Sequence, residues 1–301
     1  MSTFPEATKD TPKRGIISRA LVLISLTLLL AACSAVRLAY NQSPALTYWW
    51  IDGYADLDEV QTARLRQDID AYFDWHRSSE LPRYVERLRQ WQQLASVDST
   101  PDLACKQFDH LRSAYLRLID HGLEPMARLA LTLTPQQILH IQRKYAKNNQ
   151  AFDRDFISGG EERRLDKLME RALDRYETLY GELSPTQLGW LRESIRQSPF
   201  DARRINAERL RRQSDLLDTL RALKADPDAS VGSATRALRR WHDRVMQSPL
   251  PGFATYSDSL VRSGCEQFAA LHNTTTATQR AHAIRVLKDY EADLRALSAP
   301  D

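Results

Sequence analysis

The chain has 301 residues, of which 43% are hydrophobic and 27% are charged, enough for one sizeable core or two small ones. Its 42 lysines and arginines nearly balance 39 aspartates and glutamates, which excludes a strongly basic, nucleic-acid-binding protein. With only 10 glycines, recurrent helical spacing of apolar residues and no sustained apolar–polar alternation, the sequence excludes a sheet protein and predicts an all-α fold.

Residues 1–32 have the features of a secretory signal peptide. An uncharged apolar stretch, Ala20 to Ala32, follows the basic residues Lys9, Lys13, Arg14 and Arg19. The stretch is shorter than the roughly 20 apolar residues that a membrane-spanning helix needs. The alternative is a retained signal-anchor helix.

Leu30 to Cys33, with the sequence Leu-Ala-Ala-Cys, resembles the lipobox of bacterial lipoproteins. In those proteins the cysteine thiol receives a diacylglycerol, the chain is cut before the cysteine, and the new amino group is acylated. The resemblance implies that Cys33 is lipidated and that the protein is held at a membrane, because two or more acyl chains give a stable anchor. Since Ser34 stands where an aspartate would retain such proteins in the inner membrane, the resemblance favours the outer membrane, facing the periplasm.

Residues 33–54 would then form a lipidated tether with an aromatic lead-in, and residues 55–301 a helical periplasmic domain. The lead-in contains the aromatic residues Tyr40, Tyr48, Trp49, Trp50 and Tyr54. Tryptophan and tyrosine favour the membrane interface, so this segment could rest at the lipid headgroups. We favour the alternative, in which these side chains pack as a plug under the first helices, since large aromatic residues most often supply core area.

The first predicted helix follows Asp56, a candidate N-cap with Glu59 three residues on, as in a capping box. Pro82 should end this helix near Glu80 and open the next one as its first residue. Further helices are predicted at 102–121, 123–132, 135–157, 161–180, 185–197, 201–224, 230–247, 253–272 and 277–297. Together they predict an antiparallel multi-helix bundle of about ten helices.

Two predicted helices begin with similar sequences, Leu-Thr-Pro-Gln-Gln from Leu133 and Leu-Ser-Pro-Thr-Gln from Leu183. In each, Thr134 or Ser184 can cap the helix, and a proline takes the first helical position. The spacing between neighbouring helices is irregular, so this is weak support for an internal repeat. No solid domain boundary is visible, although a division at 181–185 is open.

Three segments resemble an uncharacterised family of helical lipoproteins from Gram-negative bacteria, a domain of unknown function. They are Arg37 to Asn41, Trp49 to Asp58 and Asp74 to Tyr84. The resemblance implies an all-α lipoprotein. It carries no activity and no catalytic residue.

Cys105 and Cys265 are the cysteines left after Cys33. In an oxidising compartment they suggest one disulfide between distant parts of the chain. The alternative is two buried free cysteines on separate helices.

Six residues are candidates for a functional site. His76 and Glu80 are four residues apart, so they could act as an acid–base dyad, although we favour a structural pair at a helix end. Asp52 and Asp56 lie close to Trp49 and Trp50, a combination that could bind or cleave a glycan. No histidine spacing indicates a metal site, and no motif indicates a cofactor or a catalytic residue.

Residues 201–224 are rich in arginine, and we favour a solvated, salt-bridged helix face over a basic docking patch. The function that we predict is a non-enzymatic, lipid-anchored module that binds another envelope protein or assists its assembly. The alternatives are a peptidoglycan- or glycan-binding protein, an envelope hydrolase, and a structural lipoprotein without a ligand.

Overall fold

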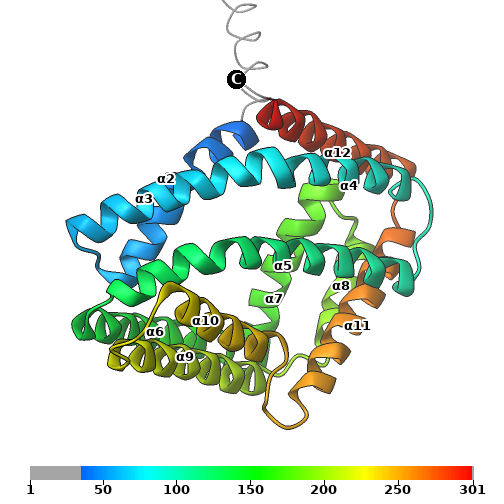
Figure 1. Ribbon diagram of the computed structural model, residues 1–301. Coiled ribbons are helices and arrows are strands. Elements are labelled where there is room, and N and C mark those ends of the chain that lie inside the picture. The colour runs from blue at the N-terminus through cyan, green and yellow to red at the C-terminus, as the bar shows by residue number, and fades with distance from the viewer. Residues whose placement is uncertain (1–34, 300–301) are drawn as a thin grey trace, which may run out of the picture.

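The protein, seen in a computed structural model that describes residues 35–299, is all-α, and that part of the chain contains no strand (Figure 1). The prediction of an all-α, multi-helix architecture is confirmed. The elements are α2 (Ala35–Ala55), α3 (Glu59–Trp75), the π-helix η1 (His76–Glu80), α4 (Leu81–Leu94), α5 (Pro101–Thr132), α6 (Pro135–Phe156), α7 (Gly160–Tyr180), α8 (Pro185–Arg196), α9 (Ala202–Ala225), α10 (Val231–Met246), α11 (Phe253–Asn273) and α12 (Ala277–Ser298). The predicted signal peptide, residues 1–32, and Cys33 lie outside the described residues.

The segment expected to be a tether is largely a helix. Residues 35–55 form α2, which contains Pro44 and packs against α3, α6 and α12. Within the described residues, the helical body therefore already includes residues 35–54. Figure 1 shows the end of α12 returning beside the start of α2, so both ends of the described chain lie on one side of the molecule.

The N-cap of helix α3 lies two residues later than expected. Asp58, and not Asp56, accepts a hydrogen bond from the amide of Gln61, and the Gln61 side chain accepts from the amide of Asp58. Asp56 instead has a positive φ of 53°, which places it in the tight turn after α2. The expected capping box of Asp56 and Glu59 is therefore wrong.

Pro82 does not end the helix. α3, η1 and α4 run on without a break, because the amide of Leu81 donates to the carbonyl of His76 five residues back. This wider π turn lets the chain pass the proline, which has no amide hydrogen to donate. The predicted stop near Glu80 is wrong, although Pro82 does lie in the first turn of α4.

Two predicted helices, 102–121 and 123–132, are one helix, α5, with Pro125 inside it. A proline in a helix interior costs about 3 kcal/mol. Burial of Leu123 and Ala127 on either side of Pro125 offsets this cost.

Four helices begin with the same type of N-terminal cap. Each has a capping residue and, three residues later, a buried glutamine: Asp58 and Gln61, Thr134 and Gln137, Ser184 and Gln187, Thr276 and Gln279. The predicted caps at Thr134 and Ser184 are confirmed.

The four glutamines form two reciprocal pairs. Gln61 and Gln137 each donate an amide hydrogen to the other, with Nε2···Oε1 distances of 3.1 and 2.6 Å. Gln187 and Gln279 do the same at 3.0 Å in both directions. Each glutamine amide also donates to a backbone carbonyl beside its partner's helix. Because displacing either helix start would leave buried amides unpaired, the pairs hold the starts of α3 and α6, and of α8 and α12, against each other.

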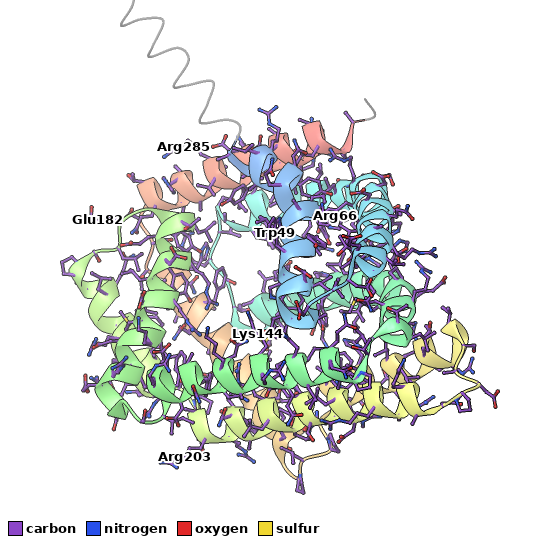
Figure 2. All side chains as sticks on the ribbon, turned by 90° about the vertical axis from the view of Figure 1, so that its left-hand side faces the viewer. Trp49, Arg66, Lys144, Glu182, Arg203 and Arg285 are labelled. Carbon is purple, nitrogen blue, oxygen red and sulfur yellow. A yellow bond between two sulfur atoms is a disulfide. The ribbon has the colours of Figure 1, made fainter. Side chains whose placement is uncertain are left out.

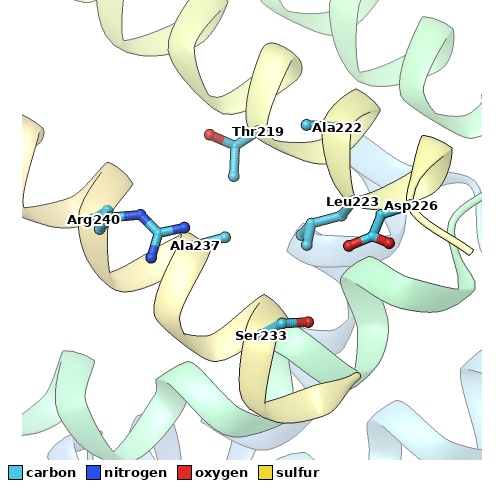
Figure 3. A pocket seen from close by; sticks show the side chains of 7 residues that line it. All are labelled: Thr219, Ala222, Leu223, Asp226, Ser233, Ala237 and Arg240. Atoms are coloured by element: carbon cyan, nitrogen blue, oxygen red, sulfur yellow. The ribbon is translucent and has the colours of Figure 1, made fainter. Parts of the chain in front are cut away.

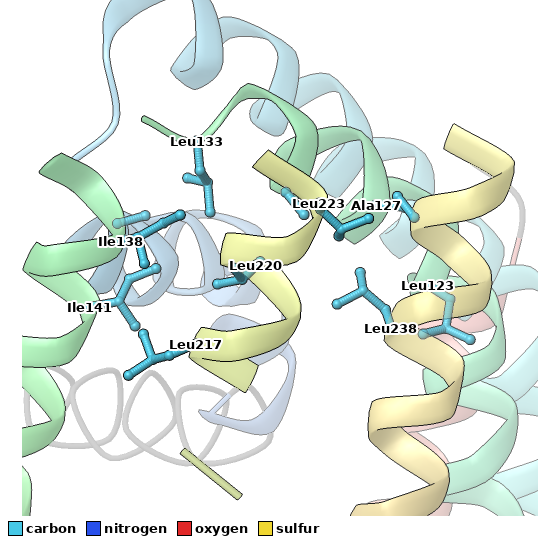
Figure 4. Packing of buried hydrophobic residues seen from close by; sticks show 12 residues of the cluster. Leu123, Ala127, Leu133, Ile138, Ile141, Leu217, Leu220, Leu223 and Leu238 are labelled. Atoms are coloured by element: carbon cyan, nitrogen blue, oxygen red, sulfur yellow. The ribbon is translucent and has the colours of Figure 1, made fainter. Parts of the chain in front are cut away.

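Two main hydrophobic cores hold the helices together. Leu133, Ile138, Leu220 and Leu238 belong to the first, which joins α5, α6, α9 and α10 (Figure 4). The second joins α4, α7, α8, α11 and α12. Since the second core contains residues from both sides of 181–185, the chain is not divided there.

A disulfide joins Cys105 of α5 to Cys265 of α11, with the Cα atoms 5.3 Å apart. The two cysteines are 160 residues apart in the sequence. Among the described helices, none has the length and apolar content to cross a membrane.

Candidate interaction site

His76 and Glu80 lie in the π-helix, and each is held by a different partner. The Nδ1 atom of His76 is 2.8 Å from the hydroxyl oxygen of Tyr40. Burial lowers the pKa of His76, more than the nearby carboxylate of Glu80 raises it, so the ring is mainly neutral at pH 7. The Glu80 side chain is almost completely buried and accepts hydrogen bonds from Arg117 at 2.7, 2.9 and 3.1 Å. The contact of His76 with Tyr40 and the contact of Glu80 with Arg117 fit a structural role better than an acid–base dyad.

The acidic residues beside the tryptophans shape a turn. One carboxylate oxygen of Asp52 accepts the amide hydrogen of Leu57 at 3.0 Å. The carboxylate of Asp56 is exposed and lies 3.8 Å from Nδ1 of His140, while its carbonyl accepts from Gln137. Asp52 and Asp56 are thus used by the turn between α2 and α3, and they are not brought together with His76 and Glu80.

Trp49 and Trp50 lie on the outside of α2, where 67% and 66% of their surfaces are exposed. Figure 2 shows α2 on the side turned toward the viewer, with Trp49 labelled on it. Tyr48 is the aromatic residue of this segment that is buried, against Leu65 and Ile69 of α3. The expectation that the aromatic residues of this segment pack under the first helices therefore holds for Tyr48 and is wrong for Trp49 and Trp50.

A groove of about 860 Å³ lies between α4 and α5 and is bordered by α12 and by Val36 of α2. Most of its lining is apolar or aromatic, and this part consists of Pro82, Tyr84, Leu88, Trp91, Leu111, Ala114, Tyr115, Leu118, Tyr290 and Leu294, besides Val36. Its volume is in the range of ligand-binding pockets. The groove exists because α4 packs along α12 while α5 packs on α10 and α11, which holds α4 and α5 apart.

Helix α5 presents an apolar stripe along this side. Phe108, Leu111 and Tyr115 follow helical spacing and are exposed by 42%, 53% and 41%. Exposed apolar groups this close together mark interaction surfaces. Sequence reasoning missed the groove, because its walls come from helices far apart in the chain, but the 108, 111 and 115 spacing was a usable signal.

The rim of the groove carries three arginines and one carboxylate, that of Glu86. Arg83, Arg87 and Arg117 line it, and Glu80 is shared between Arg83 and Arg117. Burial, together with the cations Arg87 and Lys106, lowers the pKa of His110, so this ring adds little charge at pH 7. The arginines therefore favour a ligand that combines an apolar part with an acidic group.

Most arginines of α9 form hydrogen bonds or ion pairs with other residues of the protein. Glu208, which is buried, accepts hydrogen bonds from Arg211 and Arg212, and Arg244 of α10 pairs with Asp215. The interpretation of 201–224 as a salt-bridged helix fits this geometry better than a free basic patch.

A second hollow, of about 270 Å³, lies between α9 and α10. Figure 3 shows Arg240 and Asp226 near its opposite ends, with Leu223 and Ala237 between them. It is smaller than a typical ligand pocket. No cluster of three or more metal-ligating side chains is present in residues 35–299.

Comparison with known proteins identifies one family. The sequence model of a family described as a family of unknown function (DUF6279) matches residues 53–230. No curated protein and no solved structure matches the chain.

Proposed function

We propose that this chain, which belongs to the family of unknown function DUF6279, is a lipid-anchored envelope protein whose helical body binds another envelope protein without catalysing a reaction. One feature of the sequence and one of the structure support the location. Leu30 to Cys33 resembles a lipobox, and the Cys105–Cys265 disulfide fits an oxidising compartment such as the periplasm. The outer membrane, facing the periplasm, is the location that Ser34 favours.

The observation that carries the binding proposal is the groove between α4 and α5. Its apolar and aromatic lining would cost free energy if it stayed exposed to water, and a partner's apolar segment would cover it. Arg87 at the rim, which does not share Glu80 with Arg83 and Arg117, would pair with an acidic residue next to that segment. We therefore infer a partner segment that is apolar at its centre and acidic at its edge, as in an assembly factor or chaperone that holds an exposed segment of a client.

The hydrolase alternative gains no support from the geometry. A glycosidase needs two carboxyl groups that face each other across a cleft. Asp52 and Asp56 shape a turn, and Glu80 is buried in its contact with Arg117.

Site-specific crosslinking in living cells tests the binding proposal. A photoreactive phenylalanine analogue at Leu111 is expected to form an adduct with one envelope protein, identified by mass spectrometry. Leu139 of α6 is the matched control, because it is a leucine of similar exposure, 50% against 53%, outside the groove. The substitution Arg87→Glu should lower the adduct yield several-fold, since it reverses a rim charge. The same adducts from positions 111 and 139, or no adduct from 111, would refute the proposal.

A further inference from the structure

The outer face of α2 has the composition of a membrane-contacting surface. Its exposed positions carry no charge and are Ala35, Leu38, Ala39, Asn41, Gln42, Leu46, Trp49, Trp50 and Gly53. Four of them are large apolar residues, with 61–67% of the surface exposed. The two charged residues of α2 are not among these exposed positions, and both have partners: Arg37 pairs with Asp293, and Asp52 accepts a backbone hydrogen bond.

Cations flank this face. The guanidinium of Arg66, from α3, lies 3.9 Å from the ring centre of Tyr48, and the ammonium of Lys144, from α6, lies 5.7 Å from that of Tyr54. Figure 2 shows Arg66 and Lys144 labelled beside and below Trp49. An uncharged helix face with tryptophan and leucine, bordered by basic side chains, is the pattern of a helix that lies in the plane of an anionic lipid surface.

The position of α2 in the chain connects this face with a bilayer. Ala35 follows Cys33 by two residues, so an acyl chain on Cys33 would hold the start of α2 at the membrane surface. Trp49 is 14 residues further, which is about 21 Å along the helix axis. If α2 stood upright on the membrane, both tryptophans would be in water. They reach the headgroups only when α2 lies flat.

We propose that the outer face of α2 lies on the bilayer that holds Cys33, and that it is a second membrane contact besides the lipid. This inference rests on the lipid anchor of the proposed function. Because α2 packs against α3, α6 and α12, a flat α2 fixes the orientation of the whole body on the membrane. Tryptophan at the interface and the flanking cations favour a lipid surface over a second copy of the chain.

Quenching of tryptophan fluorescence tests this contact. The lipidated protein is reconstituted into phosphatidylethanolamine–phosphatidylglycerol vesicles with or without a brominated phospholipid. Brominated lipid should quench the wild-type emission, and the variant Trp49→Phe/Trp50→Phe should lose this quenching. The control Trp190→Phe, which removes a partly buried tryptophan of α8, should keep it. Far-ultraviolet circular dichroism checks that the helical content of each variant is unchanged.

The outcomes separate the face from the anchor. Protein that stays in the supernatant after the vesicles are sedimented would show that the anchor is absent, and with it the basis of the inference. Protein that sediments with the vesicles but shows equal quenching in wild type and in the double variant would overturn the α2 contact alone. Wild-type emission that is not quenched by brominated lipid but changes with protein concentration would assign the face to a second copy of the chain. This result would also overturn the bilayer contact.

Discussion

The variant Glu208→Ala is expected to lower the free energy of unfolding by about 3–5 kcal/mol, because it breaks a buried ion pair and leaves its cations uncompensated. The Glu208 side chain is almost fully buried and accepts hydrogen bonds from Arg211, Arg212 and Ser248 at 2.5–2.8 Å. These contacts tie α9 to the segment after α10. Urea denaturation followed by circular dichroism measures the loss.

A matched control lies on the same helix. Asp218 also pairs with an arginine, Arg221, but both side chains are about half exposed or more. Asp218→Ala should cost less than about 1 kcal/mol, as exposed ion pairs do. Similar losses for Glu208→Ala and Asp218→Ala would contradict the assignment of a buried, stabilising carboxylate.

The same carboxylate predicts a dependence on pH. Burial alone would raise the pKa of Glu208, but the hydrogen bonds from Arg211, Ser248 and Arg212 outweigh it and lower the pKa to about 2. A carboxyl group with a lowered pKa stabilises the fold above its unfolded value, near 4.5, and this contribution is lost as the pH falls toward 2. The stability difference between wild type and Glu208→Gln should therefore be largest at neutral pH and shrink between pH 4.5 and 2.

Removing the disulfide is the second change with a large expected effect. The bond closes a loop with a sequence separation of 160 residues, so its loss should cost about 3–5 kcal/mol through the entropy of the unfolded chain. The variant Cys105→Ala/Cys265→Ala avoids placing a hydroxyl at the buried position 265. The oxidised wild type should also migrate faster than the reduced protein on a non-reducing gel.

Ser113→Ala, on an exposed part of α5, serves as the control and should change stability by less than about 0.5 kcal/mol. Equal stability of the wild type and the double cysteine variant, or equal migration of the wild type and Cys105→Ala without reductant, would show that the two thiols are not bonded in the purified protein.

Helix starts with local signals were predictable from the sequence. Thr134 and Ser184 cap α6 and α8, because a hydroxyl residue followed by a proline is a local signal for the start of a helix. Asp58 was missed in favour of Asp56, since two aspartates two residues apart offer the same chemistry and the turn geometry decides between them.

Features that depend on tertiary packing were not predictable. Pro44, Pro82 and Pro125 lie within continuous helical segments, where neighbouring helices or a π turn offset the loss of a hydrogen bond. Val60, near the start of α3, is 80% exposed, whereas Leu65 and Ile69 of the same helix are buried with Tyr48 of α2. The groove and both glutamine pairs need contacts between helices distant in sequence, and periodicity carries no information about those.

The lipid anchor on Cys33 is the central claim, since the membrane location and the bilayer contact of α2 both depend on it. Its most direct test is the intact mass of the full-length gene product purified from native membranes, with the N-terminal peptide sequenced by mass spectrometry. We expect a mature chain that begins at Cys33 and carries a diacylglyceryl group and an amide-linked acyl group, while Cys33→Ser retains residues 1–32. A mature chain that begins elsewhere, or a Cys33→Ser variant that is processed like the wild type, would contradict the account.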